Sequence, residues 1–300
     1  MAGVFYLAHM IDLHTHSACS DGSDTPAGLA ALGAAKGLHA LALTDHDTLN
    51  GAPAFLATCR ELRLTGLAGV EISAAVPTGT LHILGYGVDP AHTGLQQALA
   101  RVQAGRAERN AQILARLQQL GFPLAWSDVT ACAGGDVVGR LHFARALVAR
   151  SGASDVQDAF KRFLVRGRPA YAERYRLTPE DGMRLVREAG GLPVIAHPFM
   201  WQPDFEALAT AVGGLRDAGL GGIEVYYPDH MPDQIVAALR LVRKLGLVAT
   251  GGTDYHGSMK PGVALGTARG GFCVNDALLS PLLAALPGRA GIAGPFEAAP

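Results

Sequence analysis

The sequence has little charge, few aromatic residues and few cysteines. Only 17% of its 300 residues are charged and the formal net charge is -1, which excludes a generally basic protein that coats nucleic acid. Aromatic residues make up 6%, too few for a platform that stacks a long single strand. The four cysteines include no CxxC pair, so neither a zinc ribbon nor a short disulfide framework is indicated. We therefore expect a protein of the reducing cytoplasm that does not bind extended nucleic acid.

Long apolar runs and targeting signals are also missing. No stretch reaches the roughly 20 uninterrupted apolar residues that a membrane span needs. The apolar stretch at residues 4–13 is broken by His9 and Asp12 and has no basic flank, so it is a poor signal peptide and predicts a buried strand. Translation could start at Met1 or at Met10. Because 49% of the residues are hydrophobic, we expect a compact globular protein with no membrane partner.

What the sequence does contain is an alternation of short apolar runs with longer helical patterns, which is typical of βα units. In the first unit Thr25 is the expected N-cap, Pro26 the first helical residue and Gly37 the stop. Further helices are expected at residues 178–189, 205–217 and 232–245. The expected strands are residues 4–13, 38–43, 69–72, 81–85, 192–196, 222–226 and 247–250. The pattern predicts an α/β protein with a parallel sheet or barrel.

The alternation stops at residues 91–166, where the pattern is helical throughout, with apolar spacing such as Ile113 and Leu117. We therefore expect a barrel domain made of residues 1–90 and 167–300, with an inserted helical subdomain at residues 91–166.

Charge is distributed unevenly along the chain. Residues 140–176 hold nine Lys or Arg against three Asp or Glu, whereas residues 1–100 hold three against eight. The basic segment is either a solvated helix face or a surface for an anionic ligand.

Histidine and carboxylate residues gather at the ends of the expected strands. His14 and His16 lie two residues apart after the first strand, so their side chains point the same way, and Asp21 follows in a loop rich in Gly and Ser. The run TDHDT places His46 after the second strand. Either of the aspartates that flank His46 could orient a metal-bound imidazole instead of binding the metal itself.

The other strands add further donors of the same kind. A lone histidine is often a surface or core residue, but the carboxyl ends of barrel strands form the catalytic face of such folds. A four-coordinate zinc site uses only four ligands, so nine converging donors predict two or three ions. The added donors are Glu71, His82, His197, Asp254 and His256.

Taken in order, the motifs DLHTHSACSDG, TDHDT, GVEIS, LHILGY, AHPF and GTDYH resemble the PHP (polymerase and histidinol phosphatase) family. The resemblance covers nearly the whole chain and implies a distorted (β/α)7 barrel. It also implies three divalent transition-metal ions, either Mn, Fe or Zn. The intact ligand set favours an active enzyme over a non-catalytic metal-binding module. The implied ligands are His14, His16, Asp21, His46, Glu71, His82, His197, Asp254 and His256.

The insertion resembles that of a narrower branch, which acts on 3',5'-nucleotide bisphosphates and on the 5' ends of short oligonucleotides. The implied reaction is hydrolysis of a phosphomonoester by a hydroxide that bridges the metals, giving a nucleoside 5'-monophosphate. Glu71 and Asp254 are the implied catalytic residues, and the acid for the leaving group is open between Asp254 and His230. The alternative activity is that of a histidinol-phosphate phosphatase.

Four residues of the basic segment are candidates for contact with a small nucleotide or a short oligonucleotide: Arg140, Lys161, Arg168 and Tyr171. Guanidinium groups match the geometry of phosphate, so Arg140 and Arg168 are the candidates for the phosphate that does not react. Surface or structural roles are the alternative for both. Tyr171 either stacks on a base or closes the core of the subdomain.

Overall fold

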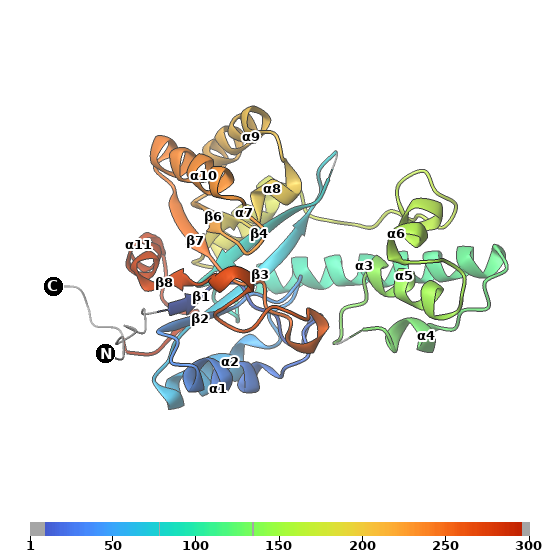
Figure 1. Ribbon diagram of the computed structural model, residues 1–300. Coiled ribbons are helices and arrows are strands. Elements are labelled where there is room, and N and C mark those ends of the chain that lie inside the picture. The colour runs from blue at the N-terminus through green and yellow to red at the C-terminus, as the bar shows by residue number, and fades with distance from the viewer. Residues whose placement is uncertain (1–9, 78, 134, 296–300) are drawn as a thin grey trace, which may run out of the picture.

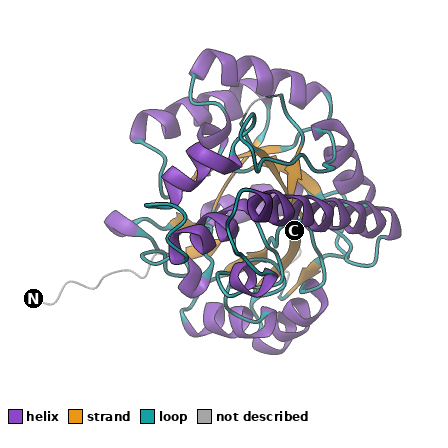
Figure 2. Cartoon of the chain, turned by 90° about the vertical axis from the view of Figure 1, so that its right-hand side faces the viewer, coloured by secondary structure: helices purple, strands orange, loops and turns teal. Residues whose placement is uncertain are grey.

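The structure is a computed structural model that describes residues 10–77, 79–133 and 135–295. Its strands form a barrel with helices around it, and a second, elongated group of helices projects from one side (Figure 1). Figure 2 views the molecule from that side and shows helices surrounding the central strands. The expected first strand is described from Met10 onward, and its earlier residues lie outside the described range.

The strands form one sheet with the order β7-β6-β5-β4-β3-β2-β1-β8, and β9 pairs with β3. The expected α/β barrel is confirmed, and the seven expected strands correspond to β1 through β7. The bounds are β1 (Met10–Asp12), β2 (Ala40–Leu43), β3 (Thr65–Ala74), β4 (Leu81–Tyr86), β5 (Leu192–Ile195), β6 (Gly222–Tyr226), β7 (Val248–Gly251), β8 (Val274–Asn275) and β9 (Ile292–Ala293).

The helices begin and end largely where capping residues predict. Thr25 caps α1, with its side chain accepting from the Gly28 amide at 3.1 Å. The α-helices are α1 (Pro26–Ala35), α2 (Ala52–Leu62), α3 (Thr93–Gln119), α4 (Trp126–Thr130), α5 (Arg140–Ala149), α6 (Val156–Ala159), α7 (Pro179–Glu188), α8 (Pro198–Trp201), α9 (Phe205–Asp217), α10 (Pro232–Leu245) and α11 (Leu279–Ala285). Shorter turns are η1 (Phe160–Leu164), η2 (Gly257–Met259), η3 (Arg269–Gly271) and η4 (Asp276–Leu278).

Among the seven expected strands, β4 runs against the expected direction. The pairs β1–β2, β2–β3, β5–β6 and β6–β7 are parallel, but β4 is antiparallel to both β3 and β5. A wholly parallel sheet was therefore the wrong expectation. The segment between β3 and β4, residues 75–80, is too short for the crossover that a parallel pair needs. As a result the beginning of β4, not its end, lies at the edge where the parallel strands finish.

The barrel nearly closes between β1 and β7, where the Leu13 amide donates to the Gly251 carbonyl at 3.2 Å. One buried cluster joins alternate residues of the strands, including Ala42, Leu84 and Val194, and is covered at one end by α11. Two other clusters lie between the strands and the surrounding helices. These apolar layers hold the strand ends, and the polar residues on them, in fixed positions.

The projecting helices, which we call the helical lobe, are α3 to α6 with η1. The first half of α3 packs on the barrel through Leu95 and Val102, and its second half packs in the lobe through Ile113 and Leu117. Every regular element described between residues 93 and 164 is a helix. The lobe's buried cluster also includes Ala170, so the expected division at residues 91 and 166 stays a prediction. Among all described residues, no helix has the length and apolar character that a bilayer crossing requires.

Candidate active site

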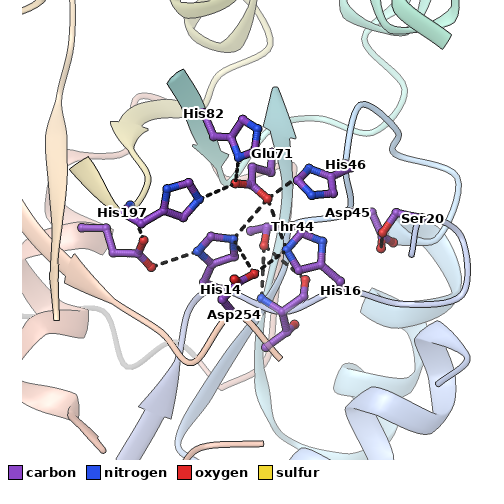
Figure 3. A network of polar contacts seen from close by, with 12 residues as sticks. His14, His16, Ser20, Thr44, Asp45, His46, Glu71, His82, His197 and Asp254 are labelled. Atoms are coloured by element: carbon purple, nitrogen blue, oxygen red, sulfur yellow. Dashed lines mark hydrogen bonds and ion pairs between the residues drawn. The ribbon is translucent and has the colours of Figure 1, made fainter. Parts of the chain in front are cut away.

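A single buried carboxylate, Glu71 of β3, lies at the centre of the site (Figure 3). Its Oε1 is 2.6 Å from Nδ1 of His82 and 3.0 Å from Nε2 of His197. Its Oε2 is 3.2 Å from Nε2 of both His14 and His16. Nδ1 of His46 is 3.1 Å from the same oxygen. Five imidazoles that come from four separate parts of the chain thus surround one carboxylate.

The strand directions explain this convergence. His14, His46 and His197 lie two or three residues beyond the ends of β1, β2 and β5. His82 is the second residue of β4, and because β4 is reversed it pairs with Ser73 near the end of β3. A residue at the start of the reversed strand therefore lies beside residues at the ends of the parallel strands.

The site fits metal ions by the spacing of its donors. Ligand atoms that share one ion lie roughly 3 Å apart, because each is about 2.0–2.2 Å from it. The Nε2 atoms of His14 and His16 lie 3.4 and 3.1 Å from Oδ1 of Asp254, in that range. These two nitrogens and Oε2 of Glu71 are buried without a hydrogen-bond partner. Buried polar atoms are seldom left unpaired, so this donor set has the chemistry of a metal site.

Three overlapping groups of donors could each hold an ion. In each group the candidate ligand atoms lie within 4.8 Å of one another. His197 belongs to none of the three but contacts Glu71. The groups are His16, Asp21, His46 and His256; His14, His16, Glu71 and Asp254; and His46, Glu71 and His82. The structure thus brings together all nine residues that were expected to be ligands. The number and identity of the ions are taken up as a proposal below.

Glu224 of β6, which sequence reasoning missed, orients two of these ligands. It is fully buried, and its Oε1 accepts from Nδ1 of His14 at 2.9 Å. Its Oε2 accepts from the backbone amide of His197 at 2.6 Å. The bond at Nδ1 leaves Nε2 of His14 free to face Glu71. The signal in the sequence was a lone acidic residue inside the apolar strand GIEVY.

Asp45 supports the loop after β1 and contacts none of the imidazoles around Glu71. Its carboxylate accepts from the amide and hydroxyl of Ser17 at 2.7 and 2.6 Å, and from the Ser20 hydroxyl at 2.5 Å. These bonds hold the loop that carries Asp21 over His46, whose Nε2 is 3.8 Å from Oδ2 of Asp21.

Asp254 divides its two oxygens between two tasks. Oδ1 faces His14 and His16, whereas Oδ2 accepts from Nζ of Lys260 at 2.7 Å and from the Tyr227 hydroxyl at 3.1 Å. Burial opposes its charge, but His14 above all holds the pKa of Asp254 well below its usual range. Because the carboxylate is ionised and only its Oδ2 is hydrogen-bonded to Lys260 and Tyr227, Oδ1 is suited to bind a metal ion. His230, the weaker candidate for the acid, lies beyond Tyr227 at 5.3 Å between ring centroids and donates from Nδ1 to the Val225 carbonyl.

The imidazoles differ in their protonation. Burial opposes the charge of His16, but contacts with Asp254 and Glu71 raise the pKa of its ring to about 10. Burial lowers the pKa of His46 to about 4, although Glu71 attracts its charge. Imidazoles bind metals in their neutral form, so metal binding at His16 displaces a proton.

A cavity of about 270 Å³ opens beside the metal-ligand cluster, and we call it the arginine cavity. Asp21, His46 and His82 form its inner side. Five arginines line the rest: Arg106, Arg109, Arg140, Arg174 and Arg176. Sequence reasoning singled out only Arg140 among them. Arg106 and Arg109 are three residues apart on α3 and so share a helix face, a signal that was present but not used.

The arginines of this cavity crowd one another. Arg109 is only 5% exposed, and burial together with the charges of Arg174 and Arg106 lowers its pKa to about 8. Burial and Arg106 lower the pKa of Arg174 to about 10. Such a cluster is stabilised by an anion placed among its guanidinium groups.

Asp47 links the metal-ligand cluster to two of these arginines. It is fully buried next to His46, and its Oδ2 accepts from Arg106 and, at 3.4 Å, from Arg174. Its Oδ1 accepts from the Ser73 amide at 2.9 Å. Burial opposes its charge, but Arg106 and Arg174 lower the pKa of Asp47 to about 2.

The four expected substrate contacts separate into two pairs. Arg140 and Tyr171 both line the arginine cavity, with the Arg140 guanidinium 5.6 Å from the centre of the Tyr171 ring. Lys161 and Arg168 are exposed and are not part of its lining.

Comparison with known proteins adds independent information. The sequence profile of the PHP domain matches residues 12–166. The 3',5'-nucleoside bisphosphate phosphatase of Chromobacterium violaceum is 34% identical over 247 residues, which are 82% of this chain and 87% of that protein. The 5'-3' exoribonuclease Rnm of Salmonella typhimurium is 33% identical over 254 residues, 83% of this chain and 86% of that protein. The structure of an amidohydrolase from Chromobacterium violaceum, with bound sulfate and no metal, superposes with a TM-score of 0.79 at 31% identity, covering 96% of this chain and 99% of that one.

Proposed function

The chain belongs to the PHP domain family, and we propose that it is a phosphatase that removes one phosphate from a 3',5'-nucleotide bisphosphate and leaves a nucleoside 5'-monophosphate. The observation that carries the proposal is the arginine cavity directly beside the metal-ligand cluster. One phosphate would lie at the metal-ligand cluster and be cleaved, while the other would lie among the arginines. The similarity to a 3',5'-nucleoside bisphosphate phosphatase supports the same substrate.

Divalent ions are part of this proposal. We propose three, with Mn, Fe or Zn as candidates, held by the nine clustered donors. When bound, they would supply Lewis acidity toward the phosphoryl oxygens and make water a nucleophile near neutral pH. No thiolate lies in the donor groups, so the ligand chemistry does not select among these metals.

The protein's own residues then have separate roles. Glu71 and Asp254 stay ionised and hold the imidazoles around the reacting phosphate. Arg109, Arg140 and Arg174 would bind the second phosphate, since guanidinium groups bind phosphate through paired hydrogen bonds. Tyr171 would close this side of the cavity. For Lys161 and Arg168, contact with the substrate stays a prediction.

Short oligonucleotides with a 5' phosphate are a second candidate substrate, which the similarity to an exoribonuclease favours. Histidinol phosphate is disfavoured, because the arginines that line the cavity would repel its cationic amine. A cytoplasmic location, like the absence of an extended nucleic-acid partner, stays a prediction from composition.

The test is phosphate release from three monoesters by the metal-loaded enzyme. We expect a higher kcat/KM for adenosine 3',5'-bisphosphate than for histidinol phosphate or para-nitrophenyl phosphate. Faster turnover of histidinol phosphate would reject the assigned substrate and leave a phosphatase of other specificity. No release from any ester would reject the enzyme activity itself.

A further inference from the structure

A second cavity, of about 420 Å³, adjoins the arginine cavity, and none of the roles proposed above uses it. The loops after β1 and β2 form one wall through Cys19 and Thr48. One face of α3 forms another, and Trp126 of α4 lies at its side. Its volume lies in the range of pockets that bind small organic ligands.

The two cavities share a boundary. Arg106 and Val137 line both of them. The second cavity is also close to the metal-ligand cluster along the chain, because Cys19 precedes Asp21 by two residues and Thr48 follows His46 by two. A ligand that occupies the arginine cavity can therefore extend past Arg106 into the second one.

The chemistry of the second cavity differs from that of the first. The residues of α3 that face it are Ala107, Asn110, Ala111 and Leu114, which recur at helical spacing beside Gln103 and Arg106. Its charged lining consists of one arginine, Arg106, and one aspartate, Asp136. A mainly apolar wall with balanced charge suits an uncharged group, not a second phosphate.

Two side chains narrow the kind of group further. The large Trp126 side chain lines this cavity and is 44% exposed overall, so part of its ring is available for stacking. Asn110 is only 3% exposed and donates from Nδ2 to the Val138 carbonyl at 3.0 Å, while its Oδ1 has no partner. An aromatic face with amide and hydroxyl groups nearby suits a flat heteroaromatic ring that has polar edges.

We propose that this cavity binds the base of the substrate nucleotide, an inference that rests on the function proposed above. The 3'-phosphate then lies at the metal-ligand cluster, the 5'-phosphate lies among the arginines, and the sugar passes Arg106. The base stacks near Trp126 against the apolar face of α3. Base recognition thus comes from the helical lobe, while the reacting phosphate is held by the barrel.

The first experiment fills the cavity. Ala111 is exposed and lines it, so Ala111→Trp should fold normally and exclude the base. Loss of one stacked base lowers kcat/KM for adenosine 3',5'-bisphosphate by roughly 5- to 150-fold. The base-free 1-deoxyribose 3,5-bisphosphate should be hydrolysed equally by variant and wild type. Ala115→Trp is the matched control, because Ala115 is exposed on α3 and lines neither cavity.

The second experiment detects binding without turnover. In Trp201→Phe holoenzyme, Trp126 is the remaining tryptophan. Adenosine 5'-phosphate should quench its fluorescence in a saturable way, and ribose 5-phosphate should not.

The outcomes separate the two proposals. Hydrolysis of neither bisphosphate, with quenching intact, would overturn the proposed function while supporting the base cavity. Equal kcat/KM for the two bisphosphates, with no quenching by adenosine 5'-phosphate, would overturn the base cavity and leave the phosphatase standing.

Discussion

Glu224 and His14 are joined by a buried hydrogen bond of 2.9 Å that fixes which ring nitrogen of His14 faces the metal-ligand cluster. Because Nδ1 carries the proton donated to Glu224, Nε2 is the nitrogen presented to Glu71 and Asp254. A carboxylate behind a ligating imidazole also makes the ligand more basic. The strand β6 thus acts on the site without supplying a ligand.

Glu224→Gln should weaken metal binding, because an amide of the same shape is a poorer acceptor for His14. The expected loss is about 10- to 100-fold in metal affinity. Competition against a chromophoric chelator measures it. Glu206→Gln, at an exposed position on α9, is the control and should bind metal like the wild type. Equal affinity in both variants would show that Glu224 has no orienting role.

Purified protein should carry more than one equivalent of transition metal, because three donor groups overlap in the site. His14→Ala should lose metal and activity together. Ions that bind only the folded state raise its melting temperature, so a chelator should lower Tm in the wild type and have a smaller effect in the variant. Elemental analysis that finds at most one ion per wild-type chain would contradict a multinuclear site.

Arg140→Ala should separate two substrates. Loss of one charge-assisted contact of about 2 to 3 kcal/mol lowers kcat/KM for a 3',5'-bisphosphate by roughly 30- to 150-fold. Para-nitrophenyl phosphate has no second phosphate, so its turnover should change little. Arg184→Ala removes an exposed arginine of α7 and should affect neither substrate. An equal fall for both esters would mean that Arg140 supports the fold or the reaction itself.

Asp47→Asn should destabilise the fold, because Arg106 and Arg174 lose their shared counter-charge. Breaking a buried pair costs about 3–5 kcal/mol, and inorganic phosphate should restore part of it by binding the same guanidinium groups. Denaturant unfolding with and without phosphate measures both effects. Asp181→Asn breaks an exposed pair with Arg184 and should cost much less stability than Asp47→Asn.

The effect of Asp47 should depend on pH in a definite direction. Its pKa of about 2 in the folded chain is below its ordinary value of 3.8. Its stabilisation is therefore complete above pH 3.8 and is lost as pH falls toward 2. The stability difference between wild type and Asp47→Asn should be larger at pH 7 than at pH 3. A constant difference would contradict the ion-pair account.

Cys59 should be the least reactive of the four thiols. It is a fully buried residue of α2, and burial raises its pKa to about 12, whereas Cys273 is exposed. The thiolate is the reactive form, so a disulfide reagent at pH 8 should modify Cys273 readily and Cys59 only after unfolding. Mass spectrometry of the labelled peptides distinguishes them. Labelling of Cys59 in the folded protein would show that α2 opens.

The convergence of the candidate ligands could be predicted from the sequence because most of them lie close to one end of a strand. His14, His46 and His197 follow apolar runs, and the strand pattern alone brings such positions together. Glu224 could not be found in this way, because it lies within a strand and its role depends on which neighbours the barrel places beside it. The direction of β4 was missed for a related reason, since periodicity indicates that a strand exists but not which way it runs.

The arginines were harder to predict than the metal ligands. Arg140 was found from the charge of its segment, and the same signal favoured Arg168, which is exposed outside the cavity. Arg106 and Arg109 belong to α3, outside the basic segment. Their position depends on how the helical lobe packs against the barrel, which local pattern does not encode.

The reversal of β4 sets a requirement on the helix that follows. Because β4 starts at the active-site edge, it ends at the opposite one, and the chain must return along the outside of the barrel before it can contribute to the site. The 27 residues of α3 span about 40 Å and place Arg106 and Arg109 near their midpoint. The number of residues in α3 before Arg106 and Arg109 therefore sets where their guanidinium groups lie. Deleting one residue between Thr93 and Arg106 would shift both guanidinium groups by about 1.5 Å and turn them by about 100°. The spacing along α3 is thus as much a part of the site as the side chains themselves.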